Sequence, residues 1–321
     1  MKIAIVHLSD FHYIENKDED YDLIYNRLQE DLKTQKLEAP NLFFSGDFVY
    51  SGSQETSYNI LKNKLEEKLT TLGIDKHKRF FTPGNHDINK DFVQKNAVIQ
   101  RGILSEMSTE RLFNDSLPSL SSQLSLDQKF KNYLDFTTSL TSKQQNPDNL
   151  SGSGYTLAPG ISIYCLNTAL CSFAGTKDNQ GTTISDYGRL MIDTRSLYKW
   201  LATDEAKIRI LIMHHPTDWL CEWAKDELEK IINESFHLVY NGHIHKAKTE
   251  QYLNPTGRAI TLTAPALFTK KSEILGYSIM ALAKHDTGAK HPNQTLVEKV
   301  AKQLIDGEAP STNKAFYNNI T

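Results

Sequence analysis

Five short segments that carry metal-ligand residues each follow an apolar, β-rich stretch of the chain. The five segments are rich in aspartate and histidine; they are Asp10-Phe11-His12, Gly46-Asp47, Gly84-Asn85-His86-Asp87, His214-His215 and Gly242-His243-Ile244-His245. The stretches that precede them are residues 3–8, 42–45, 79–82, 208–213 and 236–240. Strands that end in this way deliver the polar residues to one edge of a sheet, and in open α/β sheets ligands bind at the carboxyl edge.

Amphipathic stretches between the first three of these strands complete a β-α-β-α-β alternation. Residues 22–37 and 58–72 carry apolar side chains at helical spacing, and Gly73 is suited to end the second helix. This alternation predicts a layered α/β architecture. The further expected elements are strands at 161–166, 259–264 and 277–283, a helix from a cap at Ser185 or Asp186 to about 202, and a helix at 222–233.

The middle and the end of the chain depart from this alternation. Residues 91–154 are rich in Ser, Thr, Gln, Asn and Lys, with apolar residues at helical spacing, and we expect a helical cap or insertion of two or three helices there. A loop at 145–154 closes it. We expect residues 1–290 to form the main domain, and residues 291–321 to form a C-terminal helix, at 296–305, and a polar tail.

Composition narrows the class of protein. Of the 321 residues 39% are hydrophobic and 23% are charged, which fits a globular core, and the net charge of −3 argues against a generally basic nucleic-acid binder. Cys165, Cys171 and Cys221 lack CxxC spacing, which excludes a thiolate zinc motif and suits a reducing compartment. No signal peptide or membrane-spanning stretch is recognisable, so we expect a cytoplasmic protein without a membrane partner. The oligomeric state stays open.

Two of the segments place ligand-type residues on one face of an extended chain. If the chain continues extended past the strand, Asp10 and His12, two residues apart, can both reach one ion; His243 and His245 again place two imidazoles on one face of an extended segment. Asp47 follows a turn-forming glycine and can bridge two ions with its two carboxylate oxygens. Each motif alone also fits a solvated loop, a turn or surface histidines; their joint occurrence at strand ends favours a metal centre.

The other two segments supply different groups. Asn85 offers a neutral carbonyl oxygen, and His86 can point at a phosphate and act as an acid or a charge stabiliser. Asp87 either orients His86 through its ring nitrogen or caps a helix. His214, directly at the strand end, is the expected ligand, whereas His215 is read as a supporting or packing residue.

In this order, the five segments resemble the full signature of the calcineurin-like metallophosphoesterase superfamily over roughly residues 1–285. Residues 7–12, 164–168, 188–201 and 214–216 are also similar to the branch that contains the class III cyclic-nucleotide phosphodiesterases. The resemblance implies two stacked mixed β-sheets flanked by helices, with a dimetal site at the sheet edge.

The resemblance also implies a role for each side chain of the centre. These roles are Asp10, His12 and His245 at the first metal, Asp47 as the bridge, Asn85, His214 and His243 at the second metal, and His86 as the catalytic histidine near the leaving group.

Two divalent cations held about 3.5–4 Å apart lower the pKa of a shared water, and the resulting metal-bridging hydroxide attacks phosphorus in line. His86 then protonates or stabilises the departing oxygen. The oxygen and nitrogen ligands admit Mn, Fe, Zn, Mg or Co, with Mn as the first expectation.

The expected function is therefore a dimetal phosphoesterase, with a phosphodiesterase favoured and a cyclic nucleotide, a nucleic acid or a small metabolite as substrate. A nuclease, a phosphomonoesterase, a non-catalytic scaffold and an effector domain of a larger assembly stay open as alternatives. Trp219 and Trp223 lie in a segment expected to line the mouth of the site, where an indole can stack on a base or pack in a core.

Overall fold

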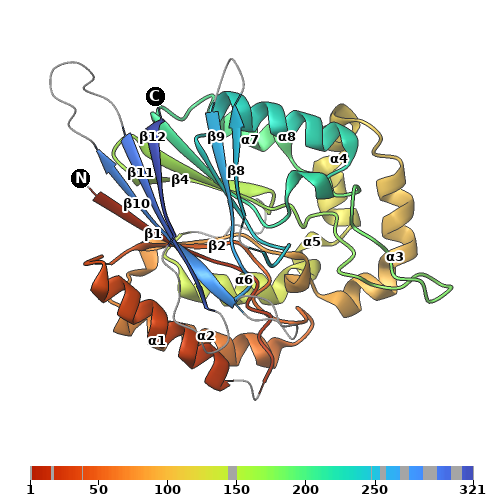
Figure 1. Cartoon of the computed structure of the whole chain (residues 1–321). Coiled ribbons are helices and arrows are strands. Elements are labelled where there is room, and N and C mark those ends of the chain that lie inside the picture. Colours follow the sequence, from red (N-terminus) through yellow and green to blue (C-terminus); the bar gives the residue numbers. More distant parts are fainter. Residues whose placement is uncertain are drawn as a thin grey trace.

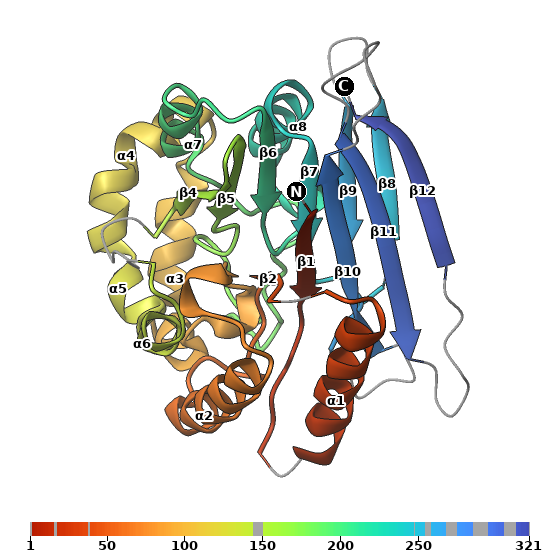
Figure 2. The same ribbon diagram turned by 90° about the vertical axis from the view of Figure 1, so that its left-hand side faces the viewer.

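The computed structural model describes residues 2–15, 18–37, 39–143, 150–246, 248–253, 258–267, 275–284, 295–304 and 313–320. Two six-stranded mixed sheets lie against each other at the centre of the molecule, with helices on their outer sides (Figures 1 and 2). This arrangement confirms the expected α/β fold of two stacked mixed sheets flanked by helices. No helix in the described ranges is both long and apolar enough to cross a membrane.

The first sheet has the strand order β12-β11-β10-β1-β2-β3, in which β1, β2 and β3 run parallel and the others pair antiparallel. Helices α1 and α2 lie on its outer side (Figure 1). Its strands and helices are β1 (Lys2–Leu8), α1 (Asp18–Thr34), β2 (Asn41–Phe44), α2 (Glu55–Thr71), β3 (Arg79–Phe81), β10 (Leu275–Lys284), β11 (Thr295–Leu304) and β12 (Asn313–Ile320).

The second sheet has the order β4-β5-β6-β7-β9-β8, with β5, β6, β7 and β9 parallel and the two edge strands antiparallel. Helices α7 and α8 lie on its outer side (Figure 1). Its strands and helices are β4 (Gly152–Ala158), β5 (Ile161–Leu166), α7 (Thr194–Leu201), β6 (Ile208–Ile212), α8 (Glu222–Ser235), β7 (Leu238–Asn241), β8 (Lys248–Leu253) and β9 (Arg258–Thr263).

Alternation along the strands fixes which side chains face the second sheet. In β1, Ile3 and Ile5 belong to the apolar cluster between the sheets, whereas Ala4, Val6 and Leu8 join the cluster that includes the helical side. The register keeps the parallel strand ends level, because Leu8 pairs with Phe44 and Phe44 with Phe81. The polar segments that follow these strands therefore begin at one edge.

Between β3 and β4 the chain forms the expected helical insertion. Its helices within the described residues are α3 (Lys90–Ser105), α4 (Glu110–Gln123), the single turn α5 (Leu126–Lys129) and α6 (Lys131–Leu140). Of the expected loop at 145–154, residues 145–149 lie outside the described residues, and β4 begins at Gly152. Strand β4 pairs antiparallel with β5, and strand β8 pairs antiparallel with β9. The sequence pattern predicted neither β4 nor β8.

The expected C-terminal helix at 296–305 is wrong, because this segment is strand β11. It pairs along its length with β10, and the expected tail supplies β12, which pairs with β11. Strand β10 offers a row of backbone groups beyond β1, and pairing with that edge overrides the local helical pattern. Strands β11 and β12 therefore extend the first sheet.

The expected helix start at Ser185 or Asp186 is also wrong, because α7 begins at Thr194 and Asp193 caps it by accepting the Ser196 N–H at 2.9 Å. The Asp186 carboxylate instead accepts the Ser172 hydroxyl at 2.6 Å and the Phe173 N–H at 2.8 Å. A short acidic side chain that is occupied by another loop cannot cap a helix.

Candidate metal centre

The five ligand-bearing segments meet at the carboxyl edge of the two sheets, where hydrogen bonds between them continue beyond the strand ends. The Asp10 N–H donates to the Gly46 carbonyl at 3.0 Å, and the His12 N–H donates to the Asp47 carbonyl at 2.9 Å. In the second sheet, the Gly242 N–H donates to the His214 carbonyl at 3.1 Å. This backbone pairing fixes the loops that carry the ligands.

Left-handed backbone is concentrated among the expected ligands. Five of the nine non-glycine residues with positive φ in the described part of the chain are of this kind: Asp10 (55°), His12 (42°), Asp47 (58°), His243 (71°) and His245 (58°). Each such residue costs about 1–3 kcal/mol and persists only where the surroundings enforce it. The expectation of extended segments is therefore wrong, because the chain turns sharply at both pairs. Asp10 and His12 still meet in one group, which His245 joins, whereas His243 joins His214.

Two glycines allow the loops to approach more closely than any side chain would permit. A Cβ on Gly242 would lie 1.9 Å from Ser9 Oγ and 2.6 Å from Asp10 Oδ2. A Cβ on Gly84 would lie 2.1 Å from Asp47 Oδ1. The absence of a side chain at these positions lets the backbone pack directly against the carboxylates.

The first group of ligands brings together Asp10, His12 and His245, with Asp47 beside them. His12 Nε2 lies 3.0 Å from His245 Nε2, and His245 Nε2 lies 3.3 Å from Asp10 Oδ1. His12 Nε2 is 3.8 Å from the nearest oxygen of Asp10 and from that of Asp47. These are the three residues expected at the first metal.

The second group consists of His214 and His243, again with Asp47. His214 Nε2 lies 3.1 Å from His243 Nδ1 and 3.2 Å from Asp47 Oδ2. His214 Nδ1 is 2.5 Å from the Ser45 carbonyl oxygen, to which it donates, so that Nε2 faces the centre. Asp47 Oδ2 therefore lies between the two groups, as a bridging ligand requires.

The spacing of these atoms fits metal ions. Two ligands that bind one ion at about 2.1 Å lie about 3.0–3.4 Å apart, and the closest contacts in both groups fall in this range. Burial lowers the pKa of His12 to about 4 and that of His243 to about 3, so both rings are neutral and present lone pairs. Histidine ligates metal ions in this neutral form.

Neighbouring charges also shift the pKa values of Asp10 and His214. Burial alone would raise the pKa of Asp10, but a hydrogen bond from His245 and the charge of His214 lower it to about 2. Burial alone would lower the pKa of His214, yet the adjacent Asp47 carboxylate raises it to about 9. Without metal, His214 therefore carries the positive charge that offsets Asp47.

His86 lies beside the first group, with its ring centroid 4.6 Å from that of His12. Its backbone N–H donates to Asp47 Oδ1 at 2.8 Å, and its Nδ1 lies 2.7 Å from the Tyr50 carbonyl oxygen. Because Nδ1 donates to this carbonyl, Nε2 is the ring nitrogen that can interact with a substrate. The role of Tyr50 could not be predicted from the sequence, because the group involved is a backbone carbonyl, which every residue has.

Of the two roles expected for Asp87, the hydrogen bonds support the cap. Its carboxylate accepts the backbone N–H of Asp47 at 2.7 Å, of Phe48 at 2.9 Å and of Gly84 at 2.8 Å, where it caps the short helix η2 (Asn85–Asp87). The Tyr58 hydroxyl donates to it at 2.9 Å. Asp87 thus ties the loop that carries Asp47 to the loop that carries Asn85 and His86.

His215 and Asn85 lie together next to the second group. His215 Nε2 is 3.2 Å from Asn85 Oδ1, and its Nδ1 is 2.9 Å from Thr168 Oγ. A nitrogen of His215 also lies within 4.8 Å of those of His214 and His243. Thr168 follows β5 at the same sheet edge, so the strand-end pattern could have revealed it.

The two tryptophans of the expected mouth have different surroundings. Trp219, at the end of the short helix η4 (Thr217–Trp219), lies edge-to-face on His243 with ring centroids 4.0 Å apart. Trp223 packs against Phe113 of the insertion, with centroids 5.7 Å apart. Only Trp219 therefore adjoins the centre.

A model of the calcineurin-like phosphoesterase family matches residues 3–247. Among solved structures, the chain is similar to the GAP50 anchor in the inner membrane complex of Plasmodium, at 11% identity and TM-score 0.49, over 99% of this chain and 90% of that one. It is similar to vacuolar protein sorting 29 from Cryptosporidium parvum at 10% identity and TM-score 0.38, over 99% of both chains. No curated protein sequence matches it.

Gly242→Ala should weaken Mn²⁺ binding at least about tenfold, because the added methyl group displaces Asp10 or the chain that carries His243. Titration calorimetry on metal-free protein measures this. Gly102→Ala is the matched control, since a methyl group there meets open space. Unchanged affinity in Gly242→Ala would show that the close approach is not needed.

Asp87→Asn should lower the free energy of unfolding by about 2–4 kcal/mol, because an amide group replaces an acceptor of several buried donors. Urea denaturation compares it with Asp135→Asn, an exposed carboxylate on α6. Native stability combined with an altered pH–rate profile would instead assign Asp87 a role in tuning His86.

Proposed function

Because the chain belongs to the calcineurin-like phosphoesterase family, and is accordingly a metal-dependent phosphoester hydrolase, we propose that its substrates are phosphodiesters. The observation that carries this proposal is the charge around the centre. The ion pairs of Asp10 and Asp47 are all with histidines; among the described residues no lysine or arginine pairs with either carboxylate.

This charge pattern favours a substrate with one negative charge. A phosphomonoester carries about 1.5–2 negative charges at neutral pH, because its second pKa is near 6. A diester carries only one. A site whose positive charge comes from metal ions and imidazoles, without a guanidinium or ammonium clamp, is better matched to the diester.

We assign the metal ligands as the contacts suggest. Asp10, His12 and His245 would hold the first ion and His214 and His243 the second, with Asp47 shared; Asn85 is proposed as a further ligand of the second ion. Two bound divalent ions would supply Lewis-acid activation of the phosphate and of a water molecule. The ligand set lacks thiolate, and Mn²⁺ is the ion we propose first, followed by Fe or Zn.

His86 is proposed as the acid that serves the leaving group. The Tyr50 carbonyl oxygen holds its Nδ1, and the contact with the Asp47 carboxylate anchors its backbone. In its protonated form the ring therefore presents the Nε2 proton to the departing oxygen. The three free cysteines, two of them buried, support the expected reducing, cytoplasmic location.

His86→Ala should lower kcat for bis-p-nitrophenyl phosphate about 100-fold or more in Mn²⁺-loaded protein, since general acid catalysis contributes on that scale. The exposed His77 supplies the control His77→Ala, which should behave as wild type. Chelation should abolish turnover in every variant.

The same assay on p-nitrophenyl phosphate decides between substrate classes. The proposal predicts a higher kcat/KM for the diester. A higher value for the monoester would contradict it and identify a phosphatase, and full diester activity in His86→Ala would remove His86 from the reaction.

A further inference from the structure

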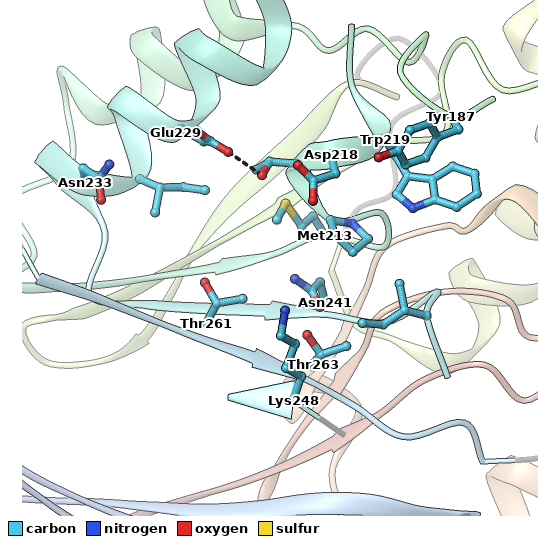
Figure 3. A pocket seen from close by; sticks show the side chains of 14 residues that line it. Tyr187, Met213, Asp218, Trp219, Glu229, Asn233, Asn241, Lys248, Thr261 and Thr263 are labelled. Carbon is cyan, nitrogen blue, oxygen red and sulfur yellow. Dashed lines mark hydrogen bonds between the residues drawn. The ribbon is translucent and has the colours of Figure 1, made fainter. Parts of the chain in front are cut away.

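A cavity of about 250 Å³ lies beside the metal centre, on the outer face of the second sheet (Figure 3). Asn241, Thr261 and Thr263 of β7 and β9 line it from the sheet, and Glu229 and Asn233 of α8 line it from the opposite side. Whole-ligand pockets commonly measure about 300–1,000 Å³, so this cavity suits a single ring system.

Two carboxamides of the lining have buried oxygens without partners. Asn241 is only 3% exposed, and its Oδ1 has no hydrogen-bond partner among the described residues. The same holds for Oδ1 of Asn233, across the cavity. Neither carboxamide makes a side-chain hydrogen bond to a described residue, and buried polar groups are seldom left unpaired, so two such carboxamides around one cavity point to a ligand that hydrogen-bonds to them.

The two carboxylates of the lining, in contrast, already have partners, and Lys248 also lines the cavity. Glu229 accepts the Thr217 hydroxyl at 2.7 Å, the bond drawn in Figure 3. Asp218 pairs with Lys225 at 2.5 Å. Because both carboxylates are engaged and a lysine also lines the cavity, the lining favours a ligand with neutral donors and acceptors over a cation.

The cavity and the metal centre share a wall. Trp219 lines the cavity and contacts the His243 ring, and Tyr187 meets Trp219 edge-to-face with ring centroids 5.4 Å apart. Ile244 lines the cavity, whereas its neighbours His243 and His245 belong to the metal groups. A ligand that contacts Ile244 in the cavity is therefore next to residues of the metal centre.

We propose that this cavity binds the nucleobase of a nucleotide phosphodiester whose phosphate lies at the metal centre. A carboxamide matches the adjacent donor and acceptor of a base edge, and aromatic rings offer faces or edges to a flat heterocycle. The cavity also has the size of one ring system. This inference rests on the proposed phosphodiesterase function and adds the substrate class.

The first test is calorimetric titration of metal-free protein with adenosine, guanosine, cytidine and uridine. At least one should bind with a Kd below about 1 mM. Asn241→Leu and the nearly isosteric Thr261→Val should each weaken that binding, the former at least about tenfold, because they remove hydrogen-bonding groups. Asn63→Leu, on the exposed side of α2, should bind as wild type.

Two results would overturn the inference. One is that none of the four nucleosides binds. The other is that folded Asn241→Leu and Thr261→Val both bind as tightly as wild type. Circular dichroism of each variant establishes folding, and Thr261→Val keeps the test valid if Asn241→Leu does not fold.

The second test asks whether the cavity and the metal centre hold one ligand together. In Mn²⁺-loaded protein, the 5′-monophosphate of the best nucleoside should bind at least about tenfold more tightly than the nucleoside and than ribose 5-phosphate. Affinity equal to that of ribose 5-phosphate would overturn the inference.

Failure of this inference is distinguishable from failure of the proposed function. Hydrolysis of bis-p-nitrophenyl phosphate without nucleoside binding would overturn the nucleobase site alone. Nucleoside binding in metal-loaded protein that cleaves no diester would support the base site and overturn the phosphodiesterase proposal.

Discussion

Two carboxylates buried close together are the constraint on which the rest of the structure depends. Asp10 is 0% and Asp47 1% exposed, and each lies within ion-pair distance of His12. Removing such charges from water costs several kcal/mol for each ion unless they are compensated. Backbone N–H groups of His243 and His86 supply part of the compensation, and the histidines supply lone pairs that suit cations. The fold therefore favours bound divalent ions.

Holding the carboxylates in place also explains the unusual backbone around them. Left-handed residues turn the chain at both ends of the ligand set, and Gly84 and Gly242 let neighbouring loops touch the carboxylates. Asp87 then joins two loops through three backbone N–H groups and the Tyr58 hydroxyl. The hydrogen bonds of Asp87, which lies next to the ligands, thus offset the backbone strain at the ligands.

The fold could be predicted where local pattern and tertiary environment agree. Apolar stretches such as β1 and β6 form buried strands, and their ends place the ligands. Prediction failed where a partner elsewhere in the chain decides the outcome. Strand β11 forms because β10 offers an edge, and α7 starts at Thr194 because Asp186 is bound by another loop. Neither partner is visible in the local sequence.

The candidate site was also predictable only in part. Residue type and position at a strand end were sufficient to predict that the five segments would meet, because sheet geometry brings strand ends together. The grouping of Asp10, His12 and His245 was predicted from the family resemblance, and these three residues do lie together. The contacts that orient these groups were not predictable. The Tyr50 carbonyl and the Tyr58 hydroxyl reach the site only through tertiary packing.

The most direct test of this account is the number of metal ions that each chain binds, measured by elemental analysis after loading with Mn²⁺ and desalting. The account predicts two ions in the wild type, two in the exposed control Asp135→Ala and fewer than one in Asp47→Ala, because both ions share that carboxylate. One ion or none in the wild type, or two ions in Asp47→Ala, would contradict it.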